Sequence, residues 1–565
     1  MSGWVGRQFS GIAPRVSPRL LADNQAQSCA NVILKHGSLT PLNANSAVLA
    51  LPKAGTIQTI HRFGQDVASD SQYWFHDAAD VNYVRGPIYG DVQERTYFTD
   101  GTQPKVTDNS IALGVTVPAG QYPTASYNLG VPAPSTAPTG TVSGTPTDAT
   151  SIPETRVYVV TLVTAWGEEG PPSNASAEQT LRVGQSVALT LPSTPAGAYN
   201  FASKRIYRSV TGTNGTPYLF VAEVSAATAS YADSVLAAAL GEQLPSLDYD
   251  PPPATLIGLT MGANGVMAGF TGKDIYFCEP YKPHAWPVKY SLTVDSTIVG
   301  IGVFDSSWLI LTKTVPYLIS GSHPDNYTMV KSELMQACMS KRGIVSAGGG
   351  VIFPSPEGLF MVSGAGPKNL TEGIFTRKEW AAMSPDTLRG YFYDNCYIGF
   401  YNSTAGFILD LESGSLAPLD WYASAGYWDA LRNALFLVTG TNGLVKFNAG
   451  AAMTMTWKSK QFYSPTPINL AVARVEAAAY PVTFNAYASD LGAGANATTL
   501  ATKLGITGLT APTSTSLKYT KSVTGSEGFP LPSGFMAKQW EYEVSGTSEI
   551  TSAGFAQDTE DLKAG

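Results

Sequence analysis

The amino-acid sequence predicts an all-β protein, both from its composition and from a hairpin pattern that recurs in its second half. Of the 565 residues, 55 are glycine and 38 are proline, 11% are aromatic, and only 14% are charged. Glycine and proline form tight turns, and aromatic side chains are enriched on pleated strands. Because the charged fraction is well below the roughly 25% of a typical globular chain, long helices with charged faces are not expected.

Five segments each combine an alternating apolar strand, a short polar turn and a second apolar or aromatic strand, which is the pattern of a β-hairpin. They read GVMAGFTGKDIYF from Gly265, WLILTKTVPYLIS from Trp308, GVIFPSPEGLFMV from Gly350, CYIGFYNSTAGFILDL from Cys396 and ALFLVTGTNGLVKF from Ala434. Successive copies begin about 40 residues apart, which is the repeat length of β-propeller blades. The repeat therefore predicts a propeller over residues 254–452.

Two earlier segments show the same pattern, QYWFHDAADVNYV from Gln72 and RTYFTDGTQPKVT from Arg95. They predict the first propeller blades within residues 51–125. If these blades belong to the same ring, residues 126–253 form an insertion between blades. The run VPAPSTAPTGTVSGTPTDATSIP from Val131 is rich in Pro, Thr, Ser and Gly, and predicts a linker at the start of that insertion.

Several predicted strands with regularly spaced turns follow this linker, which is the pattern of a β-sandwich. They begin at Thr155, Ser186 and Lys204, and the first turns at a Gly-Glu-Glu-Gly-Pro-Pro corner. The stretch YVVTLVTAWGEEGPPS from Tyr158 resembles fibronectin type III domains. The resemblance implies an inserted sandwich of that type.

The two ends of the chain differ from the repeat. In residues 1–50, Ser17-Pro18 is a helix-start signal before LLADNQAQSCANVIL, and His36-Gly37 is a helix-stop signal, so a short helix is expected there. We expect this segment to join a C-terminal platform domain over residues 453–565. In that domain, VTFNAYA and WEYEVSG alternate as strands do, and a Gly/Ala/Thr-rich loop lies between them.

No catalytic, cofactor-binding or metal-binding residues are predicted, and the chain is expected not to be an enzyme. The sequence has no HExxH, GxSxG or CxxC pattern. We expect the Gly272-Lys273 pair to form a hairpin turn and the glycines Gly348 to Gly350 a blade edge, rather than nucleotide-binding loops. The widely spaced cysteines predict four buried thiols, at Cys29, Cys278, Cys338 and Cys396. The histidines are scattered without metal-ligand spacing, at His36, His61, His76, His284 and His323.

Three groups of side chains leave a second interpretation open. Glu168 and Glu169 are consecutive carboxylates, but neighbours on a sandwich corner are expected to point apart. A gathering of acids at one ring face would suit a glycosidase, although all lie at predicted turns: Asp274, Asp305, Glu357, Asp394 and Asp410. An aromatic group is expected to pack between blades, with sugar binding as the alternative: Trp421, Tyr422, Tyr427 and Trp428.

The net charge and the hydropathy of the chain bear on whether it binds nucleic acid or spans a membrane. The formal net charge of −8 disfavours tight nucleic-acid binding, because an acidic surface gains nothing from counterion release. Transient, non-specific contact with DNA that slides past the surface remains compatible with this charge. The N-terminal residues MSGWVGRQFSG lack the basic segment and apolar run of a leader, and no apolar stretch is long enough for a membrane span, so assembly in a cytoplasm is expected.

The opening FSGIAPRVSPRLLADNQAQSCANVILKHGSLTPL resembles the start of the tail nozzle proteins of short-tailed bacteriophages, also called tail tubular protein B. The matching residues are Gly11, Pro14, Pro18, Asn24, Gln25, Cys29, Asn31, Gly37, Leu39 and Pro41. The resemblance implies a structural virion protein that forms a hexameric ring at the distal end of the tail. An adaptor or gatekeeper ring and tail fibres would be its partners, and DNA would leave through its lumen.

Two alternatives share the predicted architecture. One is a receptor-binding or fibre-anchoring tail protein, which predicts sugar binding and a trimeric assembly. The other is a propeller glycosidase that acts on host surface polysaccharide, which predicts turnover that depends on clustered acids.

Overall fold

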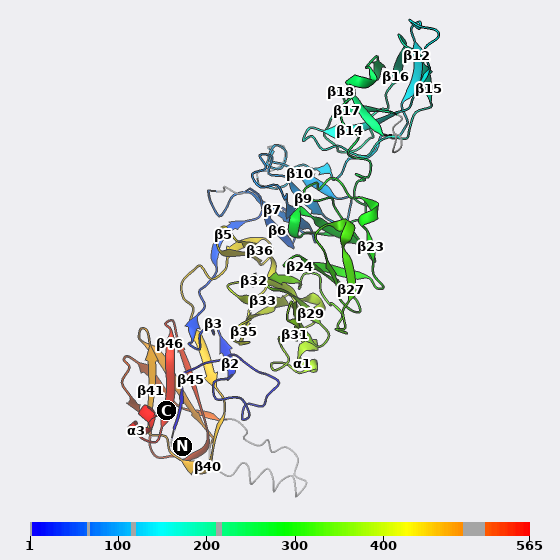
Figure 1. The fold of residues 1–565 in the computed structure, drawn as a ribbon. Helices are drawn as coiled ribbons and strands as arrows, with labels where there is room; N and C mark the ends of the chain where they lie inside the picture. The colour runs from blue at the N-terminus through cyan, green and yellow to red at the C-terminus, as the bar shows by residue number, and fades with distance from the viewer. Residues whose placement is uncertain (1–2, 65–67, 115–119, 211–216, 490–514, 565) are drawn as a thin grey trace, which may run out of the picture. The chain divides into compact units, whose positions relative to one another are not determined.

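The computed structural model describes residues 3–64, 68–114, 120–210, 217–489 and 515–564. The chain is an all-β protein with many four-stranded antiparallel sheets (Figure 1). It divides into two compact units. The first unit combines Met1–Ile60 with Gln336–Gly565, and the second unit is His61–Met335.

The second unit contains three sheets in which four consecutive strands are neighbours in sequence order. The sheets are β8 (Asn82–Arg85), β9 (Thr96–Thr99), β10 (Lys105–Thr107) and β11 (Tyr127–Asn128); β20 (Ile257–Met261), β21 (Met267–Thr271), β22 (Asp274–Phe277) and β23 (Leu292–Thr293); and β24 (Ile298–Phe304), β25 (Ser307–Thr312), β26 (Tyr317–Ser320) and β27 (Thr328–Lys331). The first strands are neighbours, since β20 contacts both β8 and β24. A β-propeller is built from four-stranded antiparallel blades, and neighbouring sheets here contact each other through their first strands.

The first unit repeats this arrangement. Its sheets are β28 (Val345–Ala347), β29 (Gly350–Ser355), β30 (Gly358–Ser363) and β31 (Gly366–Asn369); β32 (Arg389–Tyr393), β33 (Cys396–Tyr401), β34 (Ala405–Asp410) and β35 (Leu416–Leu419); and β36 (Ala423–Asp429), β37 (Ala434–Thr439), β38 (Gly443–Lys446) and β5 (Ser46–Ala50). Again the first strands adjoin, since β32 contacts β28 and β36. The outer strand of the last sheet, β5, comes from the N-terminal segment and pairs with β38.

The five predicted hairpins are confirmed as the pairs β21–β22, β25–β26, β29–β30, β33–β34 and β37–β38. The hairpin from Arg95 is also confirmed, as β9 paired with β10. The hairpin from Gln72 is wrong. β7 (Trp74–Asp77) pairs with β6 (Thr59–Arg62), and β8 pairs with β9 instead. The partner of β7 is β6, a strand that precedes the predicted segment, so the pairing runs backward along the chain rather than across the expected turn.

The inserted segment forms small antiparallel sheets around its own core. They comprise β12 (Thr139–Ser143), β16 (Ser186–Thr190) and β19 (Ser230–Asp233); β14 (Tyr158–Thr164), β17 (Phe201–Ser209) and β18 (Tyr218–Ser225); and β13 (Glu154–Arg156) with β15 (Gln179–Leu181). Tyr158, Val187 and Ile206 lie in its core. The prediction that the run from Val131 is only a linker is wrong, because Thr139–Ser143 pairs with β16 along its whole length. The Thr and Val residues of β12 are good strand formers, and their pairing with β16 outweighs the glycine and proline around them.

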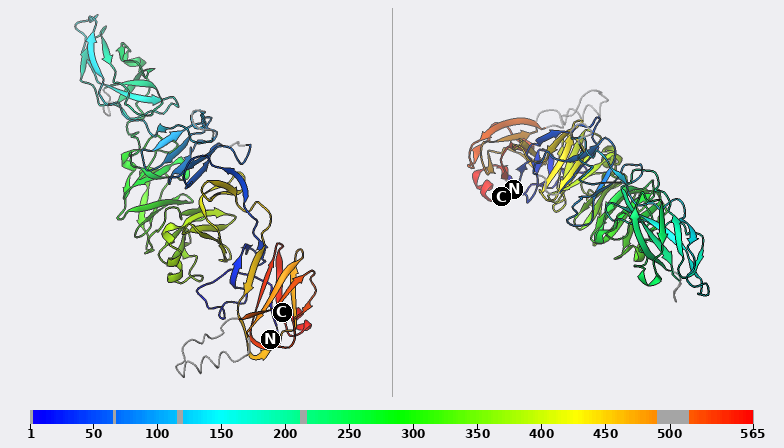
Figure 2. Two further views of the ribbon diagram at one scale, coloured as in Figure 1. Left: turned by 180° about the vertical axis from the view of Figure 1, so that it is seen from behind. Right: turned by 90° about the horizontal axis from the view of Figure 1, so that it is seen from above.

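The C-terminal domain also takes strands from the beginning of the chain. One sheet contains β1 (Gly3–Gly6), β46 (Ile550–Ala556), β41 (Val472–Ala477) and β44 (Phe529–Pro530); the other contains β2 (Ala26–Ala30), β39 (Met455–Ser459), β45 (Ala537–Gly546), β42 (Val482–Ala488), β43 (Ser516–Val523) and β40 (Phe462–Ile468). Figure 2 shows both chain ends in this domain. Trp457, Phe484 and Phe555 pack in its core. The predicted Gly/Ala/Thr-rich loop coincides with residues 490–514, which lie outside the described residues.

The helix predicted after Ser17-Pro18 is wrong. Ala26–Ala30 is strand β2, which pairs with β39, and Val32–Ile33 is strand β3, which pairs with β4 (Thr40–Pro41). The burial pattern explains the error, because Ala26 and Cys29 are buried against the sheet of the C-terminal domain and the pairing satisfies the backbone without a helix. Among the described residues, the helices are α1 (Arg377–Ala382), α3 (Thr559–Ala564) and the 3-10 turns η1 (Ala237–Ala239), η2 (Ala263–Gly265), η3 (Val288–Tyr290), η4 (Pro324–Asn326) and η5 (Pro385–Thr387). In this described part of the chain, no helix has the length and apolar character needed to cross a membrane.

Candidate functional site: a polar joint in the second unit

A tight corner at the end of β14 carries the two consecutive glutamates of the inserted sandwich. Gly167, with φ of +78°, donates from its backbone N–H to the carbonyl of Thr164 at 2.9 Å. The Thr164 N–H donates to the carbonyl of Glu168 at 2.9 Å, so the chain reverses within a few residues. Such a reversal sends neighbouring side chains in different directions, which is what the sequence predicted for Glu168 and Glu169.

Glu168 points toward the sheet that contains β8 and β9. Its Oε1 accepts a hydrogen bond from Arg95 Nη1 at 2.8 Å, and Arg95 Nε donates to Asp91 Oδ2 at 2.7 Å. The side chains of Arg95 and Glu168 are each 10% exposed. His284 lies on the other side, with Nδ1 3.8 Å from Glu168 Oε1. We call Asp91, Arg95, Glu168 and His284 the polar joint, because it connects the inserted sandwich to the propeller-like sheets of the same unit.

Burial dominates the electrostatics of the polar joint. It raises the pKa of Glu168 to about 7, although Arg95 acts in the opposite direction. Burial, together with Lys282 and Arg95, lowers the pKa of His284 to about 3. At neutral pH His284 is therefore uncharged, and Glu168 exchanges its proton near physiological pH.

Trp166, which lies in the same corner, also contacts the β8–β11 sheet. Its indole Nε1 donates to Asp108 Oδ2 at 3.1 Å, and the Arg95 guanidinium lies 5.8 Å from its ring centroid. Tyr127 of β11 packs edge-on against the ring at 5.6 Å. These contacts tie the corner to the β8–β11 sheet through a side chain as well as through the Arg95–Glu168 ion pair.

Glu169 points into the sandwich itself. It accepts hydrogen bonds from Thr161 Oγ1 at 2.6 Å and from Tyr207 Oη at 2.7 Å. Arg205 Nη1 donates to its other oxygen at 2.8 Å. Burial and this carboxylate raise the pKa of Tyr207, which keeps the phenol protonated and donating. Glu169 is therefore a structural group of the sandwich, whereas Glu168 faces the joint.

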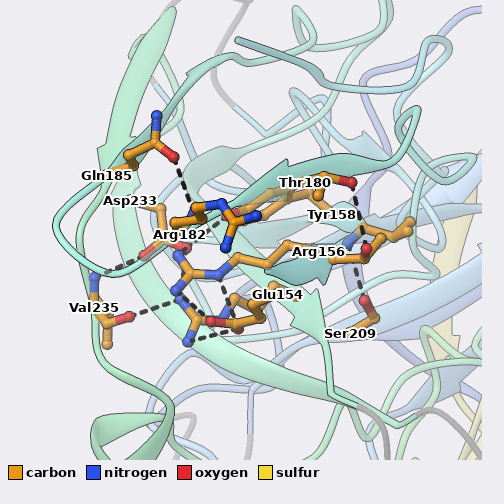
Figure 3. A network of polar contacts seen from close by, with 12 residues as sticks. Glu154, Arg156, Tyr158, Thr180, Arg182, Gln185, Ser209, Asp233 and Val235 are labelled. Atoms are coloured by element: carbon orange, nitrogen blue, oxygen red, sulfur yellow. Dashed lines mark hydrogen bonds and ion pairs between the residues drawn. The ribbon is translucent and has the colours of Figure 1, made fainter. Parts of the chain in front are cut away.

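A second buried network holds the opposite strands of the sandwich together (Figure 3). Asp233 of β19 accepts hydrogen bonds from Tyr158 Oη at 2.7 Å and from Arg208 Nη1 at 2.8 Å, and both Arg208 and Asp233 are fully buried. Arg156 Nη1 lies 3.3 Å from Asp233 Oδ2, and its other guanidinium nitrogens donate to Glu154. Arg156 lies on β13, Tyr158 and Arg208 lie on the neighbouring strands β14 and β17, and Asp233 lies on β19. The network therefore joins the three sheets of the sandwich.

A cavity of about 340 Å³ adjoins the polar joint. Its lining includes Trp166, Glu168, Tyr249, Tyr281, Lys282 and His284.

The sequence pointed to Glu168 but did not connect it with Arg95 and His284, because these two residues come from segments far away in the chain. For the separate Asp233 network a sequence signal was present, because Arg208 is a charged residue in the same row of β17 as the buried Lys204 and Ile206.

Each acid considered for a glycosidase either lies in a tight turn or contacts a neighbouring residue. Asp274 accepts from Thr293 Oγ1 at 2.6 Å, Asp394 pairs with Lys35 at 2.6 Å, and Asp410 accepts from the Glu412 N–H at 3.2 Å. Glu357 accepts from Gln336 Nε2 at 2.8 Å, and Asp305 has a φ of +49° in the β24–β25 turn.

Three of the four aromatic side chains at the start of the last sheet pack against the core of the first unit, and Tyr427 lies on β36 opposite Phe436. Trp421, Tyr422 and Trp428 lie against the core that Phe400 and Leu437 share. The Trp421 and Phe400 ring centroids are 5.1 Å apart.

Gly272-Lys273 forms the β21–β22 turn, and Gly348-Gly349 forms the β28–β29 turn. All four cysteines are free and buried. No cluster of three metal-ligating side chains occurs in the part of the chain that the structure describes.

No family model and no curated protein matches the sequence. Among solved structures, the chain is similar to the Neurospora crassa Pan2 WD40 domain, with 7% identity and a TM-score of 0.31 over 73% of this chain and 96% of that one. It is also similar to the computationally designed Ika8 protein, with 8% identity and a TM-score of 0.29 over 71% of this chain and 99% of that one. A third similar structure is Hsv2 of Kluyvelomyces marxianus, with 10% identity and a TM-score of 0.24 over 45% of this chain and 69% of that one. These TM-scores are too low to support an argument.

Proposed function

We propose that this chain is the distal nozzle protein of a short bacteriophage tail, a non-enzymatic structural protein of the virion. In this proposal the four-stranded sheets are the blades of a β-propeller, and the insertion is a fibronectin type III-like sandwich. Copies of the chain form a hexameric ring around the channel through which DNA leaves. The C-terminal domain contacts an adaptor or gatekeeper ring, and other surfaces attach tail fibres.

The observation that carries the proposal is how the nozzle-like N-terminal segment is built into the first unit. Its strands complete three separate sheets: β1 pairs with β46, β2 pairs with β39, and β5 pairs with β38. The N-terminal segment thus joins a propeller-like sheet to the C-terminal domain within one unit. In a nozzle, this connection would hold the channel-forming sheets to the domain that contacts the adaptor ring.

Residues of the nozzle-like motif occupy positions with strict steric demands. A Cβ on Gly11 would lie 2.1 Å from the carbonyl oxygen of Leu416, which no side chain tolerates. Gly37 has a φ of +83° and Asn31 a φ of +52°, the region that glycine and asparagine adopt most readily. Leu39 is fully buried. The motif therefore has a structural reason in this fold, which supports reading it as a family signature.

The acidic net charge of −8 also supports a conduit. A surface that repels DNA does not retain it by counterion release, so a polyanion passes without sticking. The proposed contact with DNA is therefore transient and non-specific.

Copy number in purified particles tests the proposal. Quantitative mass spectrometry against the portal protein should give half the portal's count if the chain forms a six-fold nozzle on a twelve-fold portal. A larger multiple of three would point to a fibre protein. Absence from the particle would overturn the virion assignment.

A further inference from the structure

The lining of the cavity beside the polar joint includes a residue with a buried nitrogen that has no hydrogen-bond partner. His284 is 7% exposed and its Nδ1 is buried without a hydrogen-bond partner. The other interaction of the ring is with the backbone of Glu169. A buried polar atom of this kind costs free energy unless a water or ligand group meets it.

One of the positively charged side chains that line the cavity is not paired with a carboxylate. Arg95 is paired with Glu168 and Asp91, and Arg205 is paired with Glu169 and Glu223. Lys282, by contrast, has no carboxylate at ion-pair distance among the described residues; it donates to the hydroxyl of Tyr249. Its ammonium also lies 4.6 Å from the Tyr249 ring centroid. One cation is therefore available to a ligand that carries one negative charge.

Aromatic side chains form the rim. Tyr281 is 56% exposed, and its ring lies over Gly265, where a Cβ would be only 2.6 Å from the ring. Tyr281 also has a φ of +58°, which is strained for a bulky residue and is retained mainly at ligand clamps and other functional sites. Tyr249 and Trp166 line the same cavity. Ring faces at a rim suit a ligand with a flat apolar face.

We propose that this cavity binds one uronic acid unit of an acidic polysaccharide. The sugar ring stacks on Tyr281, and the carboxylate pairs with Lys282. A volume of about 340 Å³ lies at the lower end of the range for ligand pockets and is large enough for a single sugar unit. A singly charged carboxylate fits better than a phosphate, because the Glu168 carboxyl in the same lining opposes a second negative charge.

This site goes beyond the proposed nozzle role and does not depend on it, since it uses only residues of the second unit. A failure of sugar binding would leave the copy-number test of the nozzle untouched, and the reverse also holds.

The test is calorimetric titration of the full-length chain with tri-galacturonic acid and with galactotriose, the matched neutral saccharide. The acidic trimer should bind with a Kd of about 1 mM or tighter, and the neutral trimer at least ~10-fold more weakly. Lys282→Gln should weaken binding of the acid at least ~10-fold and leave the melting temperature unchanged. Tyr281→Ala should also weaken it, whereas Tyr281→Phe keeps the ring and should bind normally.

Lys289→Gln is the matched control, because Lys289 lies in the same unit but is exposed and paired with Asp248. It should bind the acidic trimer as the unaltered chain does. The proposal is overturned by equal binding of the neutral trimer, by equal losses in Lys282→Gln and Lys289→Gln, or by no binding of the acidic trimer at about 10 mM.

Discussion

Arg208 and Asp233 form an ion pair of 2.8 Å although both side chains are fully buried in the inserted sandwich. Removing a charged partner from such a pair leaves the other charge uncompensated, which is strongly destabilising. The pair therefore predicts where the sandwich is most sensitive to substitution.

Replacing Asp233 with Ala should destabilise the sandwich by about 3–5 kcal/mol, because Arg208 would remain buried without its carboxylate. Hydrogen exchange of peptides from β14 and β17 measures this local stability in the full-length chain. Asp148→Ala is the control, because Asp148 is exposed and only caps its own turn through Thr150. Unchanged protection in Asp233→Ala would show that the pair does not hold the sandwich.

The polar joint predicts a specific pH dependence. The pKa of Glu168 rises from 4.5 to about 7 on folding, so the folded state holds a proton that the unfolded state has lost between these values. Stability from this group is complete below pH 4.5 and is lost as the pH rises toward 7, by about 3 kcal/mol in total. His284 acts oppositely, because its pKa falls from 6.5 to about 3.

Glu168→Gln separates the two effects, since it removes the glutamate titration and leaves His284 in place. The difference in melting temperature between the unaltered chain and the variant should be largest in favour of the unaltered chain near pH 5 and should shrink toward pH 8. A difference that stays constant over this range would contradict the assigned burial of the Glu168 carboxyl.

Gly11→Ala should loosen the N-terminal segment from β35. The new Cβ would meet the Leu416 backbone at 2.1 Å, and backbone cannot rotate away as a side chain does. Overpacking of this kind typically costs about 1–3 kcal/mol. Gly373→Ala is the control, because a Cβ at Gly373 meets nothing within 4 Å. Thermal unfolding measures both variants, and equal melting temperatures would refute the close approach.

The four cysteines should resist alkylation in the folded protein. Cys29, Cys278, Cys338 and Cys396 are buried, and burial raises the pKa of each thiol to about 12, so almost no reactive thiolate is present at pH 8. Mass spectrometry after iodoacetamide treatment should find no labelled thiol before unfolding and four afterwards. Rapid labelling of a native thiol would show that its surroundings open.

The central hairpins were predictable because in each segment two apolar strands flank a short polar turn. β25 and β26, for example, combine runs of buried apolar residues with a short polar turn. The outer strands were not predictable, since β27 reads TMVK and is largely exposed. Cys29 illustrates the helix error: the pattern around it fits a helix locally, and only its pairing with Trp457, more than four hundred residues away, makes it a strand.

The candidate site was predictable only in part. The corner glycine and the divergence of Glu168 and Glu169 follow from local turn geometry. Arg95 and His284 come from other sheets, so no local pattern connects them to Glu168. Long-range pairing of charges depends on the fold itself, which a single sequence does not reveal.

Electron cryomicroscopy of purified tails, with the chain located by a fused tag, tests the nozzle assignment most directly. The account predicts six copies in a closed ring at the distal end of the tail, around a channel wide enough for duplex DNA. Three copies in a fibre, or density away from the tail axis, would contradict it.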